Sequence, residues 1–300
     1  MTGTNDKSVR KALITAAGLA TRWLPATKAQ PKEMLPLVDK PAIQYVVEET
    51  IAAGIQDIVM ITSRGKRSLE DHFDRSFELE HYLAERGKTE LLAEVREISD
   101  MADIHYVRQK EPRGLGHAVW VGREHIGNAA FAVLLADDIM HPSSPLLGRM
   151  LEAHSTTGAS VLALKRVTDE EISSLGCAEV EAWGDDPSFV RVTNVVEKPA
   201  PGTAPSNLAV IGRYVLNPGI FAALERTPLG AGGELQLTDG IGQLMKEEPV
   251  GGVIFEKGRY DVGNKLDFLK ATIELALERD DLGPPLRAFL AQVVSGGDGS

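Results

Sequence analysis

The 300-residue sequence is poor in cysteine and in long apolar runs, and each shortage excludes a class of protein. Its single cysteine, Cys177, excludes an internal disulfide and a zinc site built on cysteines, and it is typical of a reducing compartment. The longest apolar run, residues 129–136, is too short to cross a bilayer. The first residues, MTGTNDKSVRK, lack the apolar core of a secretion signal. We therefore expect a cytoplasmic protein with no membrane partner.

Positive charge is also scarce. The chain has 32 Lys and Arg against 43 Asp and Glu, a net charge of −11, and no block of basic residues. This balance argues against a nucleic acid as partner. A protein of this charge that binds an anion must gather its cations locally, so the positions of individual Lys and Arg residues carry information.

Apolar residues, 43% of the chain, are sufficient for a sizeable core. Short apolar runs alternate with longer amphipathic stretches. The apolar runs are expected to be strands, at residues 12–17, 57–62, 104–108, 130–136, 160–166, 177–182, 189–197 and 208–216. The amphipathic stretches are expected to be helices, at residues 42–53, 66–72, 77–99, 116–125, 145–157, 218–224, 238–247, 265–279 and 285–294.

Repeated strand–helix–strand order predicts an α/β fold, with a Rossmann-like, mixed but mostly parallel sheet flanked by helices. The last three strands alternate more strictly, so they are expected to be antiparallel and nearer a sheet edge. No internal repeat and no long linker divides the chain. We expect a single domain at residues 1–294 and a disordered tail at 295–300.

The loop after the first expected strand, AAGLATRWLPATKAQPKEMLPL, gathers positive charge. Gly18 permits a turn in which successive backbone N–H groups can hold an anion. Arg22, Lys28 and Lys32 add three cations, and three prolines stiffen the chain around them. Such a loop suits a polyphosphate, although a solvated surface loop could have the same composition. The loop is neither a Walker loop nor a G-x-G-x-x-G dinucleotide fingerprint.

Three further motifs carry polar groups suited to a ligand. QKEPRGLGHA offers the amide of Gln109 and the open backbone of Gly114, although the same residues fit a plain turn into a helix. LLADDIMHP places Asp137 at the end of an apolar run, where a carboxylate can hold Mg²⁺ or cap a helix. VVEKP joins Glu197 to Lys198, which on a regular strand would point to opposite faces, as at a solvated edge.

Residue order adds more than composition does. AGLATRWLPATKAQPKEMLPLVDKPAIQY closely resembles the signature loop of the nucleotidyltransferases that make nucleotide sugars, in their bacterial UTP–glucose-1-phosphate uridylyltransferase (UDP-glucose pyrophosphorylase) branch. The resemblance covers about residues 11–293 and includes FDRSFELE, GLGHAV, VVEKP, APSNLAVIGRYVL, GAGGELQLTD and DVGNKLDFLKA in family order. It implies the nucleotide-diphospho-sugar transferase fold, with a nucleotide-binding part at about 8–166, a sugar-binding part at about 167–264 and C-terminal helices at 265–294.

The resemblance also implies a reaction, in which UTP and glucose 1-phosphate give UDP-glucose and pyrophosphate. The sugar phosphate attacks the α-phosphate in line, with Mg²⁺ as cofactor. The family's functional positions carry over to this sequence in four groups. Catalytic roles fall to Arg22, Lys32 and Lys198, nucleotide binding to Ala17, Gly18, Glu33, Gln109 and Gly114, sugar binding to Gly176, Glu197 and Lys198, and metal binding to Asp137 and Asp261.

Three residues depart from the family pattern and keep alternatives open. Ala20 replaces the second glycine of G-x-G-T-R, Ala136 the proline of L-P-D, and Leu175 the tyrosine of a Tyr-Gly pair. A β-carbon at position 20 is costly only if that residue is left-handed. The alternatives are a thymidylyltransferase, another sugar 1-phosphate as acceptor, or a non-catalytic nucleotide-sugar-binding paralogue. Because the family forms dimers and tetramers, we expect a homodimer or homotetramer, with residues 265–294 as candidate interface.

Overall fold

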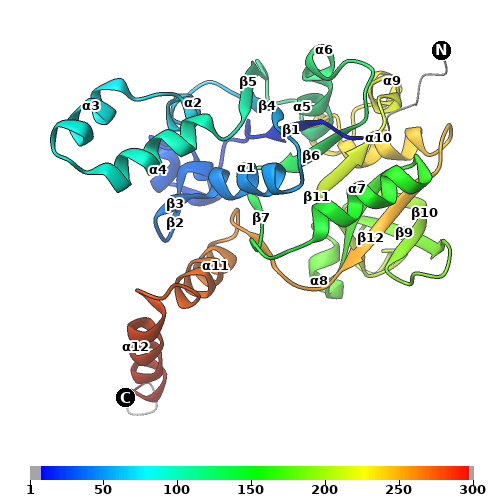
Figure 1. The fold of residues 1–300 in the computed structure, drawn as a ribbon. Helices are drawn as coiled ribbons and strands as arrows, with labels where there is room; N and C mark the ends of the chain where they lie inside the picture. Colours follow the sequence, from blue (N-terminus) through cyan, green and yellow to red (C-terminus); the bar gives the residue numbers. More distant parts are fainter. Residues whose placement is uncertain (1–7, 297–300) are drawn as a thin grey trace.

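The computed structural model describes residues 8–296 and is built around a nine-stranded sheet (Figure 1). The strand order is β5-β4-β1-β6-β11-β8-β12-β10-β9, and β11 also pairs with β9. Seven of these strands run in one direction and β10 and β11 run against them, so the expected mixed, mostly parallel sheet is confirmed. The strands are β1 (Lys11–Thr15), β4 (Asp57–Thr62), β5 (Asp103–Arg108), β6 (Phe131–Leu135), β8 (Ser160–Arg166), β9 (Gly176–Ala182), β10 (Phe189–Glu197), β11 (Leu208–Leu216) and β12 (Val250–Phe255).

One expected strand lies elsewhere in the sheet than predicted. β11 pairs antiparallel, as expected, but it lies between β6 and β8 in the middle of the sheet rather than near an edge. All nine of its residues are buried. The polar residues that made the run look alternating, Arg213 and Tyr214, are themselves internal. β9 and β10 do lie at the edge.

Helices cover both faces of the sheet (Figure 1). The apolar side chains of α5, α6, α9 and α10 pack on one face, and those of α1, α2, α7 and α11 on the other. The helices are α1 (Ala42–Ala52), α2 (Arg67–Phe73), α3 (Phe77–Glu85), α4 (Thr89–Asp100), α5 (Leu115–Val121), α6 (Arg123–Ile126), α7 (Leu146–Thr157), α8 (Asp169–Ile172), α9 (Gly219–Arg226), α10 (Leu237–Leu244), α11 (Lys265–Leu277) and α12 (Gly283–Gly296).

Two stretches expected as single helices are each divided in two. The stretch 77–99 forms α3 and α4, because Gly87 takes a left-handed φ of 64° after α3 ends. The stretch 116–125 forms α5 and α6, which meet at Gly122. A β-carbon on Gly122 would lie 2.3 Å from Cδ1 of Leu13, so the missing side chain allows close packing on β1.

β12 was not predicted, because Gly251 and Gly252 interrupt its short apolar run, and the short strands were not predicted either. β2 (Pro36–Leu37) and β3 (Lys40–Pro41) form a small hairpin, and β7 (Asp138–Met140) pairs with β13 (Arg259–Asp261). Runs of two or three residues carry no readable period, so sequence patterns miss them. The β7–β13 pairing places Asp261 opposite Asp138 and so next to the expected metal ligand Asp137.

The C-terminal helices lead away from the sheet, and α12 projects furthest (Figure 1). We predicted a disordered tail at residues 295–300. This prediction is wrong for residues 295 and 296, which belong to α12, and residues 297–300 lie outside the described residues. Among residues 8–296, no helix combines the length and apolar character needed to span a membrane.

Candidate active site

The loop that follows β1 is folded into three short 3₁₀ turns, η1 (Thr21–Trp23), η2 (Ala26–Lys28) and η3 (Lys32–Met34). Side-chain hydrogen bonds hold these turns in place. The indole N–H of Trp23 donates to the carbonyl of Val262 (3.0 Å), and the hydroxyl of Thr27 donates to the carbonyl of Ala20 (2.9 Å). The loop is therefore a fixed structure that can present its cations in defined positions.

This loop forms one wall of a cavity of about 480 Å³, a size that suits a small-molecule ligand. Thr15 and Leu135, the last residues of β1 and β6, contribute to its lining, so it lies at the carboxyl ends of parallel strands. Eight of the predicted site residues line it: Ala17, Gly18, Arg22, Lys32, Glu33, Gln109, Gly114 and Asp137.

The two expected metal ligands lie close together beside this cavity. A β-carbon placed on Gly263 would lie 2.8 Å from Oδ1 of Asp261, 3.2 Å from Oδ2 of Asp137 and 3.5 Å from Nη2 of Arg22. The backbone N–H of Val262 also donates to the carbonyl of Asp137 (2.9 Å). Two carboxylates from distant parts of the sequence therefore converge on one point, and only a glycine leaves that point open.

Electrostatics distinguish the two carboxylates. Burial opposes ionisation of Asp137, but its ion pair with Lys32, helped by Arg22, holds the pKa of that carboxyl below its ordinary value. Burial raises the pKa of Asp261, and the negative charge of Asp137 raises it further. A cation placed between the two carboxylates would relieve this repulsion.

The site fits a divalent cation that is only partly held by protein. In the part of the chain that the structure describes, no cluster of three or more His, Cys, Asp or Glu side chains could hold a metal. Mg²⁺ commonly takes one or two carboxylates and completes its shell with water and substrate phosphates. Asp137 and Asp261 match that donor set, and the ammonium of Lys32 already lies against Asp137.

Glu33 lines the cavity but is already paired inside the protein. Its side chain is 1% exposed, and Nζ of Lys66 lies 2.6 Å from its Oε2. The pair joins η3 to the start of α2. Since Glu33 follows Lys32 directly, this buried pair fixes the backbone from which Lys32 reaches the cavity.

Gln109 and Gly114 also line the cavity and are brought together as expected. Nε2 of Gln109 donates to the carbonyl of Gly114 (3.2 Å). Gly114 has a φ of 95°, and a β-carbon there would lie 2.6 Å from the carbonyl oxygen of Leu235. Only glycine fits this position, because the backbone of Leu235 fills the space that a side chain would occupy.

Gly176, Glu197 and Lys198 form a second group, outside the lining of this cavity. Glu197 pairs with Gly176 across β10 and β9, and a β-carbon on Gly176 would lie 3.4 Å from Oε2 of Glu197. β10 ends at Glu197, and Lys198 takes a left-handed φ of 44°. Nζ of Lys198 thus lies 3.2 Å from Oε1 of Glu197, so two adjacent side chains can serve one ligand.

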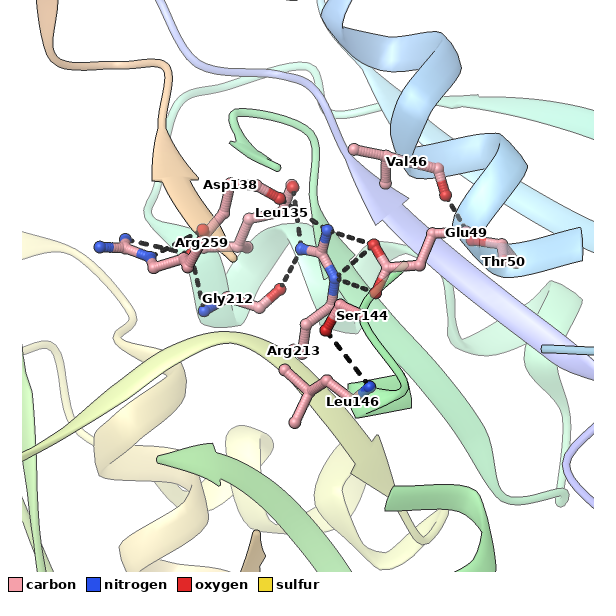
Figure 2. A network of polar contacts seen from close by, with 10 residues as sticks. All are labelled: Val46, Glu49, Thr50, Leu135, Asp138, Ser144, Leu146, Gly212, Arg213 and Arg259. Carbon is pink, nitrogen blue, oxygen red and sulfur yellow. Dashed lines mark hydrogen bonds and ion pairs between the residues drawn. The ribbon is translucent and has the colours of Figure 1, made fainter. Parts of the chain in front are cut away.

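A buried charge network supports the strand ends that carry Asp137 (Figure 2). The fully buried guanidinium of Arg213 forms an ion pair with Glu49 of α1 (2.6 Å). It also donates to the carbonyls of Leu135 (3.4 Å) and Asp138 (2.6 Å), on either side of Asp137. The turn between β6 and β7 is thereby held at both ends.

The same network extends to Arg259, on the strand that carries the second carboxylate (Figure 2). The side chain of Asp138 accepts from Nε of Arg259 (2.8 Å) and from the backbone N–H of Gly212 (3.0 Å). Arg259 begins β13, the strand that ends at Asp261. Sequence reasoning missed Arg213, although a charged residue inside an apolar run signals an internal ion pair. It also missed Arg259, which lies in no apolar run. It also missed Glu234 and Gly263 in the cavity lining.

Comparisons with known proteins find relatives that match almost the whole chain. Residues 11–278 match the family model described as nucleotidyl transferase. The chain is 52% identical to the UTP–glucose-1-phosphate uridylyltransferase of Bacillus subtilis over 96% of this chain and 98% of the relative. It is also similar to the UTP-bound UGPase of Acinetobacter baumannii, with a TM-score of 0.87 and 38% identity, covering 95% of this chain and 99% of that one. A UDP-glucose pyrophosphorylase complexed with UDP-glucose superposes with a TM-score of 0.81 at 40% identity, covering 90% of this chain and 100% of that one.

Proposed function

Because the chain belongs to the nucleotidyl transferase family, we propose that it transfers the uridylyl group of UTP to glucose 1-phosphate, giving UDP-glucose and pyrophosphate. The observation that carries this function is the gathering of two cations and two carboxylates beside one cavity at the carboxyl ends of β1 and β6. Arg22, Lys32, Asp137 and Asp261 make up this group. A protein of net charge −11 has few other ways to hold a triphosphate.

The nucleotide occupies the cavity. Its base lies at Gln109 and Gly114, and its phosphates run along Ala17 and Gly18 towards Arg22 and Lys32. Support comes from the cavity lining, which joins these two ends. Arg22 and Lys32 neutralise the charge that collects on pyrophosphate as it leaves.

The acceptor lies at the second group. Lys198 orients the sugar phosphate, Glu197 accepts from sugar hydroxyls, and the bare backbone of Gly176 lets the ring approach. An oxygen of the sugar phosphate forms a bond to the α-phosphorus of UTP while the bond to the β-phosphate oxygen breaks. No general base is required, because the attacking phosphate is already ionised at neutral pH. Most of the rate enhancement comes from holding two polyanions in line.

Mg²⁺ is the cofactor that we propose, held by Asp137 and Asp261. When bound, it supplies positive charge to the α-phosphate. Lys32, which pairs with Asp137, lies where it can turn to phosphate oxygens instead.

A pyrophosphate-release assay tests the function directly. We expect release with UTP and glucose 1-phosphate that needs a divalent cation, and slower release with dTTP or galactose 1-phosphate. Faster turnover with dTTP would show a thymidylyltransferase. Binding of UDP-glucose without any pyrophosphate release would show the non-catalytic alternative.

Three further features stay proposals. We propose a homodimer or homotetramer through α11 and α12, which expose apolar side chains. The nucleotide part at about 8–166 and the sugar part at about 167–264 share the site, since Glu234 and Gly263 of the latter line the nucleotide cavity. The cytoplasmic location is a prediction from composition.

A further inference from the structure

The side-chain amide of Gln109 has a fixed orientation. Gln109 follows β5 and is buried. Its Nε2 lies 3.2 Å from the carbonyl oxygen of Gly114 and 2.9 Å from Nδ1 of His117, on the first turns of α5. A carbonyl oxygen can only accept a hydrogen bond, so the amide nitrogen, not its oxygen, must face Gly114.

This orientation determines the state of His117. The amide nitrogen of Gln109 can only donate, so Nδ1 of His117 must accept, and the ring is neutral with its proton on Nε2. Burial and the nearby charge of Arg113 lower the pKa of His117, although Glu111 opposes them, which favours the neutral ring. The ring stacks on Trp120, with centroids 6.0 Å apart, so its position is also supported.

Both hydrogens of the amide nitrogen are therefore in use. The oxygen of the Gln109 amide is the group left for a ligand, and within residues 8–296 no protein group donates a hydrogen bond to it. Gln109 and Gly114 both line the cavity. The protein thus offers a hydrogen-bond acceptor at the base end of the site.

We propose that His117 is a positioning residue that sets base specificity, because it holds the Gln109 amide with its oxygen towards the nucleobase. Uracil and thymine carry a donor, N3–H, on the edge that meets this oxygen. Cytosine carries an unprotonated N3, whose lone pair would face the oxygen and be repelled. The site therefore selects pyrimidines with an N3–H and rejects cytosine. This inference rests on the proposed function, since it takes Gln109 as the residue that meets the base.

Loss of the acceptor on His117 should loosen the amide. Only the longer bond to Gly114 would then oppose a flip that turns the amide N–H₂ group towards the base. The flipped amide suits cytosine and not uracil. Selectivity for uracil over cytosine should fall. Discrimination between uracil and thymine should not change, because both bases carry the N3–H edge.

Two variants separate the acceptor from the ring. His117→Phe keeps a ring to stack on Trp120 but has carbon in place of Nδ1. His117→Asn loses the ring but can place an acceptor oxygen near the position of Nδ1. The experiment measures kcat/KM for UTP, dTTP and CTP with saturating glucose 1-phosphate, together with nucleotide binding by calorimetry.

For His117→Phe we expect the ratio of kcat/KM for UTP over CTP to fall about three- to tenfold, the range for one hydrogen bond, with the UTP to dTTP ratio unchanged. His117→Asn should restore most of the UTP to CTP ratio. An equal loss with all three nucleotides in His117→Phe, or an unchanged UTP to CTP ratio, would overturn the proposal. So would a His117→Asn variant as unselective as His117→Phe. Failure of the proposed function is a separate result, because the unmodified protein would then release no pyrophosphate from UTP.

Discussion

Backbone strain at a single residue distinguishes the loop after β1. Ala20 has φ 54° and ψ 37°, a left-handed conformation that costs a residue with a β-carbon about 1–2 kcal/mol. Its carbonyl accepts from Thr27, so the conformation is held by the loop around it. The sequence left open whether a β-carbon at position 20 is costly. It is, because Ala20, where the family has glycine, takes the left-handed conformation.

Replacement of Ala20 by glycine should relieve this strain. Part of the gain is offset by the extra freedom of glycine in the unfolded chain, about 0.4–1 kcal/mol. We expect Ala20→Gly to raise the free energy of unfolding by up to about 1 kcal/mol, measured by urea denaturation. Ala29→Gly is the control, because Ala29 has an ordinary φ of −119° and its replacement should destabilise the loop. A variant at position 20 less stable than the unmodified protein would contradict the strain.

Crowding at Gly263 should affect chemistry more than stability. A β-carbon there would lie 2.8 Å from Asp261 Oδ1 and 3.2 Å from Asp137 Oδ2, so Gly263→Ala must push the carboxylates apart. We expect kcat to fall about 10²-fold, as when one charge-stabilising contact is lost, with weaker binding of Mn²⁺ by electron paramagnetic resonance. Gly148→Ala in α7 is the control, since nothing lies within 4 Å of the added carbon. Normal ion binding by Gly263→Ala would contradict the assignment of the two carboxylates.

Much of the site could be predicted from single residues. The residues that could not be predicted are those whose role depends on contacts made only in the folded chain. Eight of the predicted residues line one cavity because their motifs follow strands whose ends meet at one edge of the sheet. Gly263 and Arg259 could not be found in this way, because their importance comes from the β7–β13 pairing. The role of His117 depends on one 2.9 Å contact that no sequence motif specifies.

At the scale of elements, long apolar strands were predictable and interruptions were not. The bounds of β4, β8, β10 and β11 are those expected. β4 and β8 are nearly continuous apolar runs, and in β10 and β11 apolar residues recur around the polar ones along the whole strand. The division of the stretch 77–99 depends on the left-handed Gly87, which amphipathic periodicity does not register. The position of β11 depends on long-range pairing, which local pattern does not encode.

The α3–α4 hairpin projects from the body and relies on charge for its internal contacts (Figure 1). No residue of α4 is fully buried. Glu80 of α3 accepts from Arg75 (2.6 Å) and from Arg96 of α4 (2.9 Å). These hydrogen bonds lower the pKa of Glu80 from 4.5 to about 2.

Because its pKa is lower in the folded state, ionised Glu80 should stabilise the hairpin above pH 4.5, and that contribution should disappear as the pH falls to about 2. We expect Glu80→Gln to be less stable than the unmodified protein near neutral pH, with the difference shrinking across this window. Hydrogen exchange of α3 and α4 at several pH values measures it. Glu78→Gln, an exposed position on α3, is the control. If the difference in stability between Glu80→Gln and the unmodified protein did not change between pH 5 and about pH 2, the ion pairs of Glu80 would not explain it.

The whole molecule exposes apolar side chains on its projecting C-terminal helices. Leu266 and Leu269 of α11 and Phe289 and Val293 of α12 are between 54% and 59% exposed. Large side chains on a projecting element are typical of an interface between subunits. The clustering of these residues on two successive helices supports the proposed homo-oligomer.

Charge on this surface should separate the subunits. We expect Phe289→Asp combined with Val293→Asp to shift the protein from dimer or tetramer to monomer in light scattering, because association would bury two carboxylates. Leu229→Asp is the control, since Leu229 is equally exposed (56%) but lies away from α11 and α12 in the sequence. An unmodified protein that is monomeric, or a double variant that stays assembled, would refute this interface.

The distribution of charge over the whole molecule is central to the proposed function. Under the proposed function, a chain of net charge −11 binds two polyanions through Arg22 and Lys32, which lie near two carboxylates that can share a divalent ion, and through Lys198 in the second group. A crystal structure with UDP-glucose and Mg²⁺ tests this most directly. We predict an ion about 2.0–2.1 Å from carboxylate oxygens of both Asp137 and Asp261 and in contact with the diphosphate. An ion bound elsewhere, or a diphosphate remote from these two carboxylates, would contradict the account.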